Sequence, residues 1–260
     1  MNVVVCIKQV PDTSQVKIDP ITKNLVREGV VSIINPYDLY AIEEGVRLIE
    51  KHGGKVTVIS MGPPQAEAVL REAISLGCDE GILISDRAFA GSDTLATSYT
   101  LAMAVKKVKD FDIIICGKQA IDGDTAQVGP GIAAHLDIPQ ITYVRKIEDS
   151  GGNALVAQRT IEEGYEVVKA PLPCLITVVK EINKPRIPSL KGKMKAKKAE
   201  IVKWSAADLD AESDRLGIMG SPTEVWKIYT PPARAKGKIF DGDPQEAVNT
   251  IVSELKDYLN

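Results

Sequence analysis

The chain has 260 residues, of which 44% are hydrophobic and 26% charged, and its net charge is -3. This length can bury a sizeable core without disulfides, and the near-neutral charge excludes a global attraction to nucleic acid or to anionic membranes. The four cysteines lack CxxC or Cys/His spacing, and there is neither a secretion signal nor an apolar run of about 18 residues, so we expect no metal site, no membrane contact and reduced thiols in a cytoplasmic protein.

Residues 1–145 alternate short apolar runs with amphipathic stretches, which is typical of a parallel sheet covered by helices. Runs with near-continuous Val and Ile predict strands that are buried on both faces, at residues 3–7, 55–60, 81–85 and 112–116. The amphipathic stretches predict helices at residues 37–51, 64–76, 93–107 and 125–137.

Residues 141–179 change to period-two or mixed patterns, which predict strands at residues 143–147, 154–159, 166–170 and 174–179. Gly151-Gly152-Asn153 predicts a hairpin turn between the first two of these strands. A hairpin makes its strands antiparallel, so we expect antiparallel strands at the edge of the sheet. The fold class that follows is α/β, with a doubly wound, mostly parallel sheet.

Residues 185–203 hold seven Lys or Arg against one acid, Glu200, and include two prolines. This composition predicts a mobile basic loop rather than part of the core. Clustered cations can neutralise nucleic-acid phosphates, but the segment has no interleaved aromatic side chains to stack bases, so we expect no nucleic acid. Two interpretations stay open: a solvated surface, and a docking site for an acidic protein surface.

Prolines and glycines beyond residue 229 separate a last amphipathic helix, residues 244–259, from the rest of the chain. We therefore expect a nucleotide-binding α/β domain over residues 1–229 and a C-terminal arm over residues 230–260. The arm's composition indicates that it packs on another surface.

The loop after the fourth strand, residues 117–130, is the strongest candidate for a ligand site. In a doubly wound sheet, ligands bind outside the carboxyl ends of the strands. This loop carries glycines and runs into a predicted helix start, where backbone amides and the Thr125 hydroxyl can hold a diphosphate. In the simpler interpretation, Asp124 or Thr125 only caps the helix. Because carboxylates repel phosphate, Asp122 and Asp124 are expected to cap amides or to accept ribose hydroxyls.

Three further positions point to the same edge. Gly62, after the second strand, lets backbone approach a ligand. The string Asn35-Pro36-Tyr37-Asp38 precedes the first long helix and can present side chains to the crevice, although it is also a simple proline-assisted helix start. Thr94, at a helix start after the third strand, is expected to contact phosphate.

Several enzyme classes lack their motifs here. No GxGxxG follows the first strand, no GxxxxGK[ST] or GxSxG occurs, and the only histidines, His52 and His135, lie near helix ends. An ATP pyrophosphatase needs a Ser/Gly-rich loop after the first strand, where Lys8-Gln9-Val10-Pro11 stands instead. No side chain is expected to act as a catalytic acid or base.

In combination, these segments resemble the electron transfer flavoprotein beta subunit family along nearly the whole chain. The string Gly-Lys-Gln-Ala-Ile-Asp at 117–122, followed by Gln127, is similar to the family's nucleotide loop, and residues 156–177 resemble the family signature. The resemblance implies that the nucleotide is surrounded by Cys6, Lys8, Asn35, Tyr37, Asp38, Met61, Gly62, Thr94, Gly117, Gln119, Ala120, Asp122, Gly123, Asp124, Thr125, Ala126, Gln127 and Val128.

The resemblance also gives the basic segment and the arm a role. Residues 184–198 resemble the family's recognition loop, in which a leucine enters a pocket of the client dehydrogenase, and Leu190 is the matching position. The implied partner contacts are Leu190, Lys191, Lys193, Met194 and Lys195. The implied heterodimer partner is an alpha subunit, on which the C-terminal arm packs.

Gly123 and Ala126 replace the acidic residue and the asparagine of family members that hold AMP, and the chain in this respect resembles the bifurcating subtype, whose beta subunit holds FAD. The resemblance implies that NADH reduces this FAD, that one electron goes through the alpha-subunit FAD to a flavin dehydrogenase such as an acyl-CoA dehydrogenase, and that the other goes to ferredoxin or flavodoxin. The alternatives are a non-bifurcating carrier that holds AMP and a pure interaction module with a vestigial site.

Overall fold

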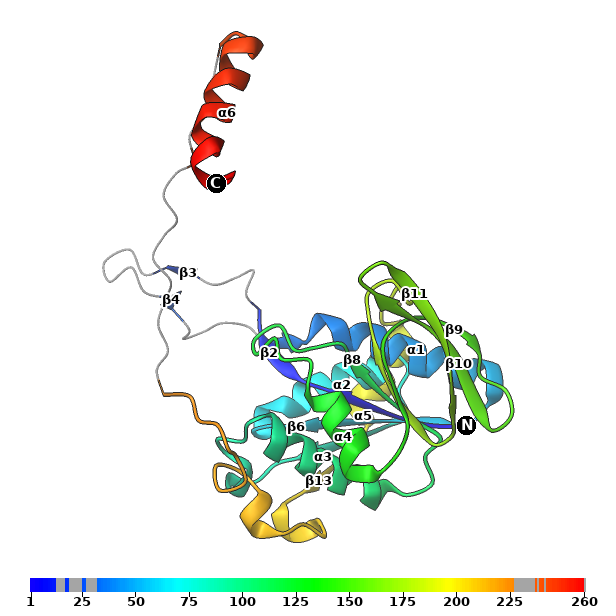
Figure 1. Cartoon of the computed structure of the whole chain (residues 1–260). Coiled ribbons are helices and arrows are strands. Elements are labelled where there is room, and N and C mark those ends of the chain that lie inside the picture. Colours follow the sequence, from blue (N-terminus) through cyan, green and yellow to red (C-terminus); the bar gives the residue numbers. More distant parts are fainter. Residues whose placement is uncertain are drawn as a thin grey trace. The chain divides into compact units, whose positions relative to one another are not determined.

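The computed structural model describes residues 1–12, 17–18, 25–26, 32–226, 237, 239–240 and 242–259. The chain divides into two compact units, Met1–Trp226 and Lys227–Asn260. The first unit contains the sheet and its covering helices, and the described part of the second contains one helix, α6 (Pro244–Leu259), at the position that the sequence predicts (Figure 1).

A nine-stranded sheet forms the centre of the first unit. Its order is β11-β10-β9-β12-β8-β1-β6-β7-β13, and β10 is the strand that runs antiparallel to its neighbours. The strands are β1 (Asn2–Ile7), β6 (Lys55–Met61), β7 (Glu80–Ile84), β8 (Ile113–Gly117), β9 (Gln140–Asp149), β10 (Ala154–Ile161), β11 (Gly164–Pro171), β12 (Cys174–Val178) and β13 (Ile201–Trp204). Short pairs join β2 (Gln9–Pro11) to β5 (Ser32–Ile34) and β3 (Lys17–Ile18) to β4 (Leu25–Val26).

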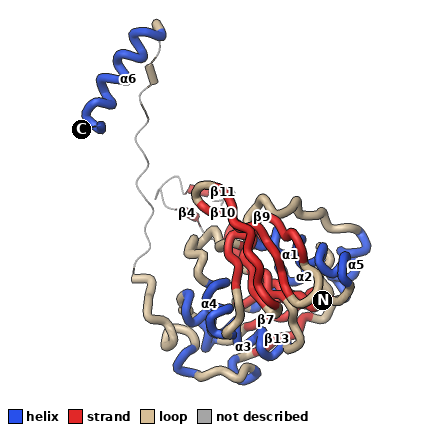
Figure 2. The backbone as a smooth tube through the Cα atoms, turned by 45° about the vertical axis from the view of Figure 1, so that its right-hand side comes forward, coloured by secondary structure: helices blue, strands red, loops and turns tan. Residues whose placement is uncertain are grey.

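Helices cover both faces of the sheet (Figure 2). Alternate residues of β1 belong to two cores: Val3 and Val5 pack with α1 (Pro36–His52) and α2 (Glu67–Ser75), whereas Val4 packs with α3 (Thr94–Val108) and α4 (Val128–Leu136). Side chains of successive strand residues point to opposite faces, so a strand buried on both must be apolar throughout. The expected doubly wound, mostly parallel sheet is confirmed.

Two predicted segments were wrong in direction or type. Residues 174–179 were expected near an antiparallel edge, but β12 lies inside the sheet and runs parallel to β8 and β9. Residues 185–203 were expected as a loop, but they contain α5 (Leu190–Lys198) and the edge strand β13, which pairs in parallel with β7. Ser189 caps the start of α5, and Ala196 and Ile201 are buried in the core beside α2, which explains why a basic segment is ordered.

Two helix ends were also shifted. The helix expected from residue 125 begins at Val128, because Asp124 and Ala126 both have φ of 55°, which a right-handed helix does not allow. Residues 64–66 form a 3-10 turn before α2, which ends at Ser75. Short 3-10 turns also stand at Arg87–Phe89, Ala206–Asp208 and Ser213–Arg215. Among the described residues, no helix combines the length and apolar character needed to cross a membrane.

Candidate nucleotide site

The predicted ligand loops meet at one edge of the sheet. β1 pairs in parallel with β6 on one side and with β8 on the other, so these three strands end side by side. The residues that follow them are Lys8, Gly62 and Lys118. Beyond Lys8 the chain continues into β2, so a strand occupies the place where an ATP pyrophosphatase would need its phosphate loop.

Asn35 fastens the loop after β8 to the start of α1. It is 1% exposed, and its Nδ2 donates to the carbonyl of Gln119 at 2.8 Å and to Asp38 Oδ1 at 2.9 Å. The amide of Ile121 donates to Asn35 Oδ1 at 3.1 Å. Both ends of one buried side-chain amide therefore hold the backbone at residues 119–121 in place.

Asp38 lies beneath the same loop. Its Oδ2 accepts from the Lys8 amide at 2.7 Å, and a Cβ at Gly117 would lie 2.3 Å from its Oδ1, so only glycine fits there. Burial raises the pKa of Asp38 to about 7, although hydrogen bonds from Asn35, Lys8 and Gly117 oppose the rise. The carboxyl group therefore changes charge close to neutral pH.

The two loop aspartates accept from side chains. Lys8 Nζ donates to Asp122 Oδ1 and Oδ2 at 2.7 and 2.8 Å, and Gln119 Nε2 donates to Asp124 Oδ1. The simpler interpretation of this loop, in which Asp124 or Thr125 only caps α4, is wrong, because Gln127 occupies the N-cap position and makes no side-chain cap hydrogen bond. Among the described residues, no side chain accepts from the first amides of α4, while the Lys8 ammonium lies beside the loop.

The start of α3 meets the start of α4. Thr94 Oγ1 donates to Gln127 Oε1 at 2.9 Å. Asp93 caps α3 by accepting from the amides of Leu95 and Ala96 at 2.9 and 3.1 Å. Since a carboxylate already occupies the positive end of α3, the uncapped end of α4 is the better place for an anion.

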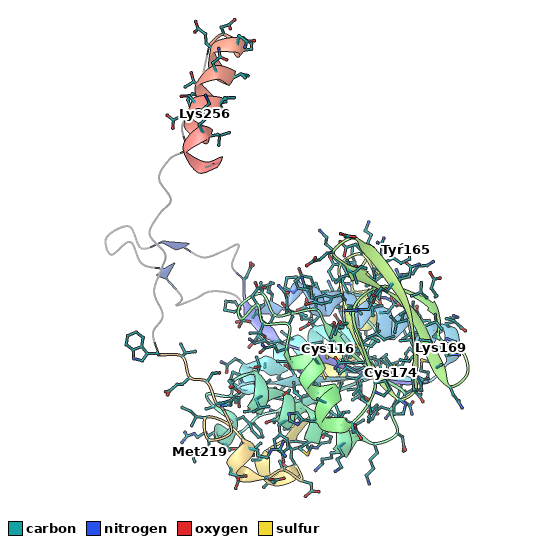
Figure 3. The ribbon with its side chains drawn as sticks, in the orientation of Figure 1. Cys116, Tyr165, Lys169, Cys174, Met219 and Lys256 are labelled. Carbon is teal, nitrogen blue, oxygen red and sulfur yellow. The ribbon has the colours of Figure 1, made fainter. Side chains whose placement is uncertain are left out.

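Small and buried groups complete this edge. Gly62 packs against Ala66, where an added Cβ would lie at 3.1 Å, and a Cβ at Gly123 would meet nothing within 4 Å. Cys6 and Cys116 are opposite each other on β1 and β8 and are 7% and 6% exposed. Cys116 lies in the interior of the unit (Figure 3). A hydrogen bond with Cys6, together with burial, raises the pKa of the Cys116 thiol, which therefore stays protonated and is not a nucleophile.

An open cavity of about 800 Å³ adjoins the loop, and the sequence did not predict it. It takes Tyr37 from α1, Lys118 from the loop, Tyr143 and Arg145 from β9, and Arg159 from β10. Lys118 Nζ lies 5.3 Å from the centre of the Tyr143 ring. Of the residues that line this cavity, Lys118 lies within the string that resembles the nucleotide loop. The sequence does not show that the residues of β9 and β10 line the same cavity, because this depends on how the strands pair.

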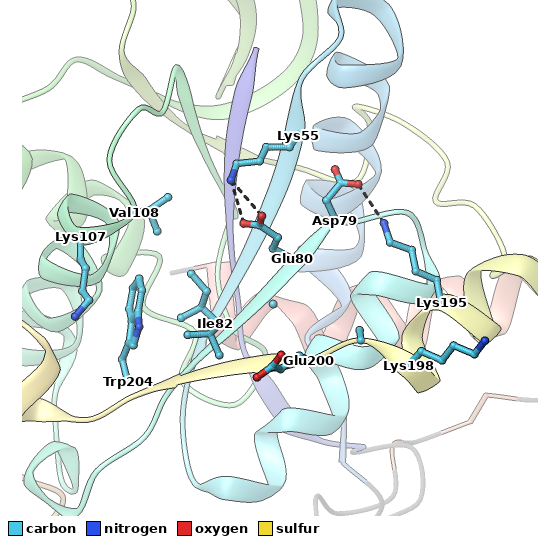
Figure 4. A pocket seen from close by; sticks show the side chains of 13 residues that line it. Lys55, Asp79, Glu80, Ile82, Lys107, Val108, Lys195, Lys198, Glu200 and Trp204 are labelled. Carbon is cyan, nitrogen blue, oxygen red and sulfur yellow. Dashed lines mark hydrogen bonds and ion pairs between the residues drawn. The ribbon is translucent and has the colours of Figure 1, made fainter.

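The predicted partner contacts lie on or beside α5, away from the loops just described. Leu190 is 78% and Met194 55% exposed, and Lys191 and Lys193 are exposed as well. Lys195 is exposed too, and it donates to Asp79 Oδ1 at 3.1 Å and to the Cys78 carbonyl at 3.0 Å, so it fastens α5 to the turn before β7 (Figure 4).

Comparison with known proteins identifies the family. A family model described as "Electron transfer flavoprotein domain" matches residues 22–209. The electron transfer flavoprotein subunit beta of Thermoanaerobacterium thermosaccharolyticum is 55% identical over 256 residues, which cover 98% of each chain. The chain belongs to the electron transfer flavoprotein beta subunit family.

Two further relatives of this family are similar over the same length. The electron transfer flavoprotein subunit beta of Clostridium acetobutylicum is 51% identical over 257 residues, covering 99% of this chain and 98% of the relative. Subunit CarD of the caffeyl-CoA reductase-Etf complex of Acetobacterium woodii is 47% identical over 259 residues, with the same coverage. As an electron transfer flavoprotein beta subunit, the chain acts in electron transfer with an alpha subunit, and its family binds a flavin or AMP nucleotide.

Proposed function

We propose that the chain binds FAD at the carboxyl edge of its sheet and serves as the beta subunit of a bifurcating electron transfer flavoprotein. In this function NADH reduces the bound FAD, and the electrons part between a flavin dehydrogenase, reached through the alpha-subunit FAD, and ferredoxin or flavodoxin. The observation that carries the proposal is the uncapped start of α4 beside the loop 117–127.

The donor set fits a pyrophosphate. The first amides of α4 have no side-chain cap, and the Thr94 and Gln127 side chains meet at the same helix start. Lys8 adds a cation that can exchange its carboxylate partner, Asp122, for a phosphate, because both side chains are partly exposed. Released from Lys8, Asp122 becomes free to accept from ribose hydroxyls.

The loop leaves space that favours FAD over AMP. Gly123 has open surroundings, and Ala126 follows it with a short side chain. The adjoining cavity of about 800 Å³ is lined by Tyr37, Lys118 and Arg145 and lies next to the loop. A ligand that begins at the loop and continues into this cavity must be larger than a mononucleotide.

FAD supplies hydride acceptance and one-electron transfer when bound, and the chain's residues bind and orient it. Asn35 and Asp38 fix the backbone of the loop by hydrogen bonds with Gln119, Ile121 and Gly117, and the α4 amides together with Lys8 would balance the pyrophosphate charge.

Two exposed apolar surfaces fit the partners. Leu190 and Met194 project from α5 among lysines, which suits an apolar pocket with an acidic rim on the dehydrogenase. In the second unit, Val248, Ile251, Val252 and Leu255 form one exposed face of α6, with the spacing of a helix that packs on another protein, and we assign this face to the alpha subunit.

The test is to purify the chain with its alpha subunit, release the bound nucleotides and identify them by mass. Two FAD per heterodimer are expected. One FAD and one AMP would establish the non-bifurcating carrier instead, and the absence of any nucleotide from this chain would leave only an interaction module. Gly123→Glu, which fills the open space and adds charge, should lower FAD content, whereas Gly151→Glu, in the β9–β10 hairpin, should leave it unchanged.

A further inference from the structure

The exposed apolar side chains of residues 183–198, the recognition segment, stand on an ordered support. Ile187 is 89% exposed, Leu190 78% and Met194 55%. An apolar side chain on a loose loop loses conformational freedom when it docks, and this loss weakens binding. The attachments of the recognition segment to the rest of the unit therefore bear on how well it can bind a partner.

Arg186 makes the strongest of these attachments, and it binds two carboxylates of α1. Its Nε donates to Glu43 Oε2 at 2.8 Å, and its own backbone amide donates to the same oxygen at 3.1 Å. Its Nη1 and Nη2 donate to Glu50 Oε1 and Oε2 at 2.6 and 3.0 Å. The planar guanidinium thus spans two turns of α1, and Glu43 is only 5% exposed at its side chain.

Other contacts hold the two ends of the recognition segment. Asn183 Nδ2 donates to the Tyr40 carbonyl and to Glu44 Oε2, both at 3.0 Å. At the far end, Arg71 Nη1 donates to the carbonyls of Ala196 and Ala199 at 2.8 and 3.0 Å. Arg186 lies between these ends and directly before Ile187, so it controls the stretch that bears the exposed apolar side chains.

We propose that Arg186 is a positioning residue for partner docking: by binding Glu43 and Glu50 it holds Ile187 and Leu190 in the orientation in which they meet the dehydrogenase. This inference rests on the proposed role of the recognition segment in docking. Arg186 does not touch the nucleotide loop, so it acts on the partner's affinity and not on the cofactor's chemistry.

Arg47 provides a matched control. Its Nε donates to Glu43 Oε1 at 2.6 Å, so it pairs with the same buried carboxylate as Arg186. Arg47 lies on α1 itself, four residues after Glu43, and no hydrogen bond or ion pair joins it to the described recognition segment. Replacing either arginine by alanine removes one cation from Glu43 and leaves the other. Only the Arg186 variant releases the recognition segment.

The experiment uses the heterodimer with its bound nucleotides and compares Arg186→Ala with Arg47→Ala. The first readout is hydrogen exchange of the amides of residues 187–195, which should quicken about tenfold in Arg186→Ala and stay unchanged in Arg47→Ala. The second is steady-state reduction of an acyl-CoA dehydrogenase that the wild type reduces. Its KM should rise about tenfold in Arg186→Ala, while kcat and the reduction of ferricenium, which needs no docking, remain unchanged.

Equal exchange and equal KM in the two arginine variants would overturn the proposal. If Arg186→Ala fails to fold, Glu50→Gln replaces it, because Glu50 is exposed and its loss weakens the Arg186 fork without leaving a buried charge; unchanged exchange in that variant would also overturn the proposal. Leu190→Ala separates the docking role of the recognition segment from the positioning role of Arg186. If its KM is unchanged while Arg186→Ala still loosens residues 187–195, the docking role of the recognition segment is wrong, and with it the positioning of a docking surface.

Discussion

The loop 117–127 and the recognition segment are both attached to α1, but by different chemistry. Asn35 and Asp38, two buried side chains at the start of α1, hold the loop through hydrogen bonds with the backbone of Gln119, Ile121 and Gly117. Glu43 and Glu50, further along, hold the recognition segment through ion pairs with Arg186 that are partly open to water. The buried contacts impose one backbone path, which a ligand site needs. The ion pairs fix an orientation and still leave apolar side chains exposed for a partner.

The largest effect is expected from Asn35→Ala. The substitution leaves the Gln119 carbonyl and the Ile121 amide without their buried partner, which costs about 3 kcal/mol, and nucleotide content should fall at least tenfold. Asn2→Ala is the control, since its side chain makes one exposed hydrogen bond to the Asp110 carbonyl at the opposite edge. Thermal unfolding and nucleotide extraction measure both. Intact nucleotide content in Asn35→Ala would show that the loop is not held by α1.

A paired glycine exchange sharpens the same point. In Gly117→Ala the new Cβ would lie 2.3 Å from Asp38 Oδ1 and 2.7 Å from the Tyr37 carbonyl carbon, so backbone must move and stability should fall by about 2 kcal/mol. In Gly123→Ala the new Cβ meets nothing within 4 Å, so the free energy of unfolding should stay within about 0.5 kcal/mol of the wild type. Urea denaturation measures the free energy of unfolding of both variants, and similar losses of stability in the two would contradict the expected difference.

The two attachments should also differ in their response to pH. The folded pKa of Asp38, raised by burial to about 7, exceeds its ordinary 3.8, so its contribution is most favourable below pH 3.8 and is lost as pH rises through 7. A hydrogen bond from Arg186 lowers the pKa of Glu50, and bonds from Arg186 and Arg47 outweigh the burial of Glu43. The contribution of these two carboxylates is present above about pH 4.5 and lost as pH falls further.

Unfolding free energies measured from pH 5 to 8 test this difference. Asp38 should contribute a downward slope of at most about 1.4 kcal/mol per pH unit that Asp38→Asn removes, even though Asn places an amide group toward the Lys8 amide and lowers stability overall. Glu50→Gln should leave the slope in this range unchanged. If Asp38→Asn keeps the downward slope of the unfolding free energy with pH, the slope comes from another titrating group.

The smallest effect is expected from Thr94→Val. This change removes the hydrogen bond from Thr94 to Gln127 at an exposed helix start, so stability should fall by less than about 1 kcal/mol. Nucleotide affinity should fall a few-fold, because Gln127 loses its partner beside the uncapped amides of α4. Calorimetric titration of FAD into nucleotide-depleted heterodimer measures this, with Thr250→Val in α6 as the control for loss of a threonine hydroxyl.

The sequence was sufficient for the parallel strands β1, β6, β7 and β8 and their covering helices, because burial on both faces requires continuous Val and Ile. It also placed the loop after β8 at the carboxyl edge of the sheet, because the glycines there follow a strand and precede a helix. It failed at α5 and β13, where seven cations concealed a helix whose ends are fixed by Ser189 and by Arg71, a residue more than 100 positions away. It did not predict that α4 starts only at Val128, because no residue type in the loop indicates the positive φ of Asp124 and Ala126.

Mounting the loop and the recognition segment on α1 has a consequence for how electrons leave the protein. The 13 residues from Asp38 to Glu50 form continuous helix, in which 12 rises separate the two ends by about 18 Å. The helix therefore fixes the distance between the loop and a partner that docks on the recognition segment. Any change in that distance would therefore have to come from movement outside this helix.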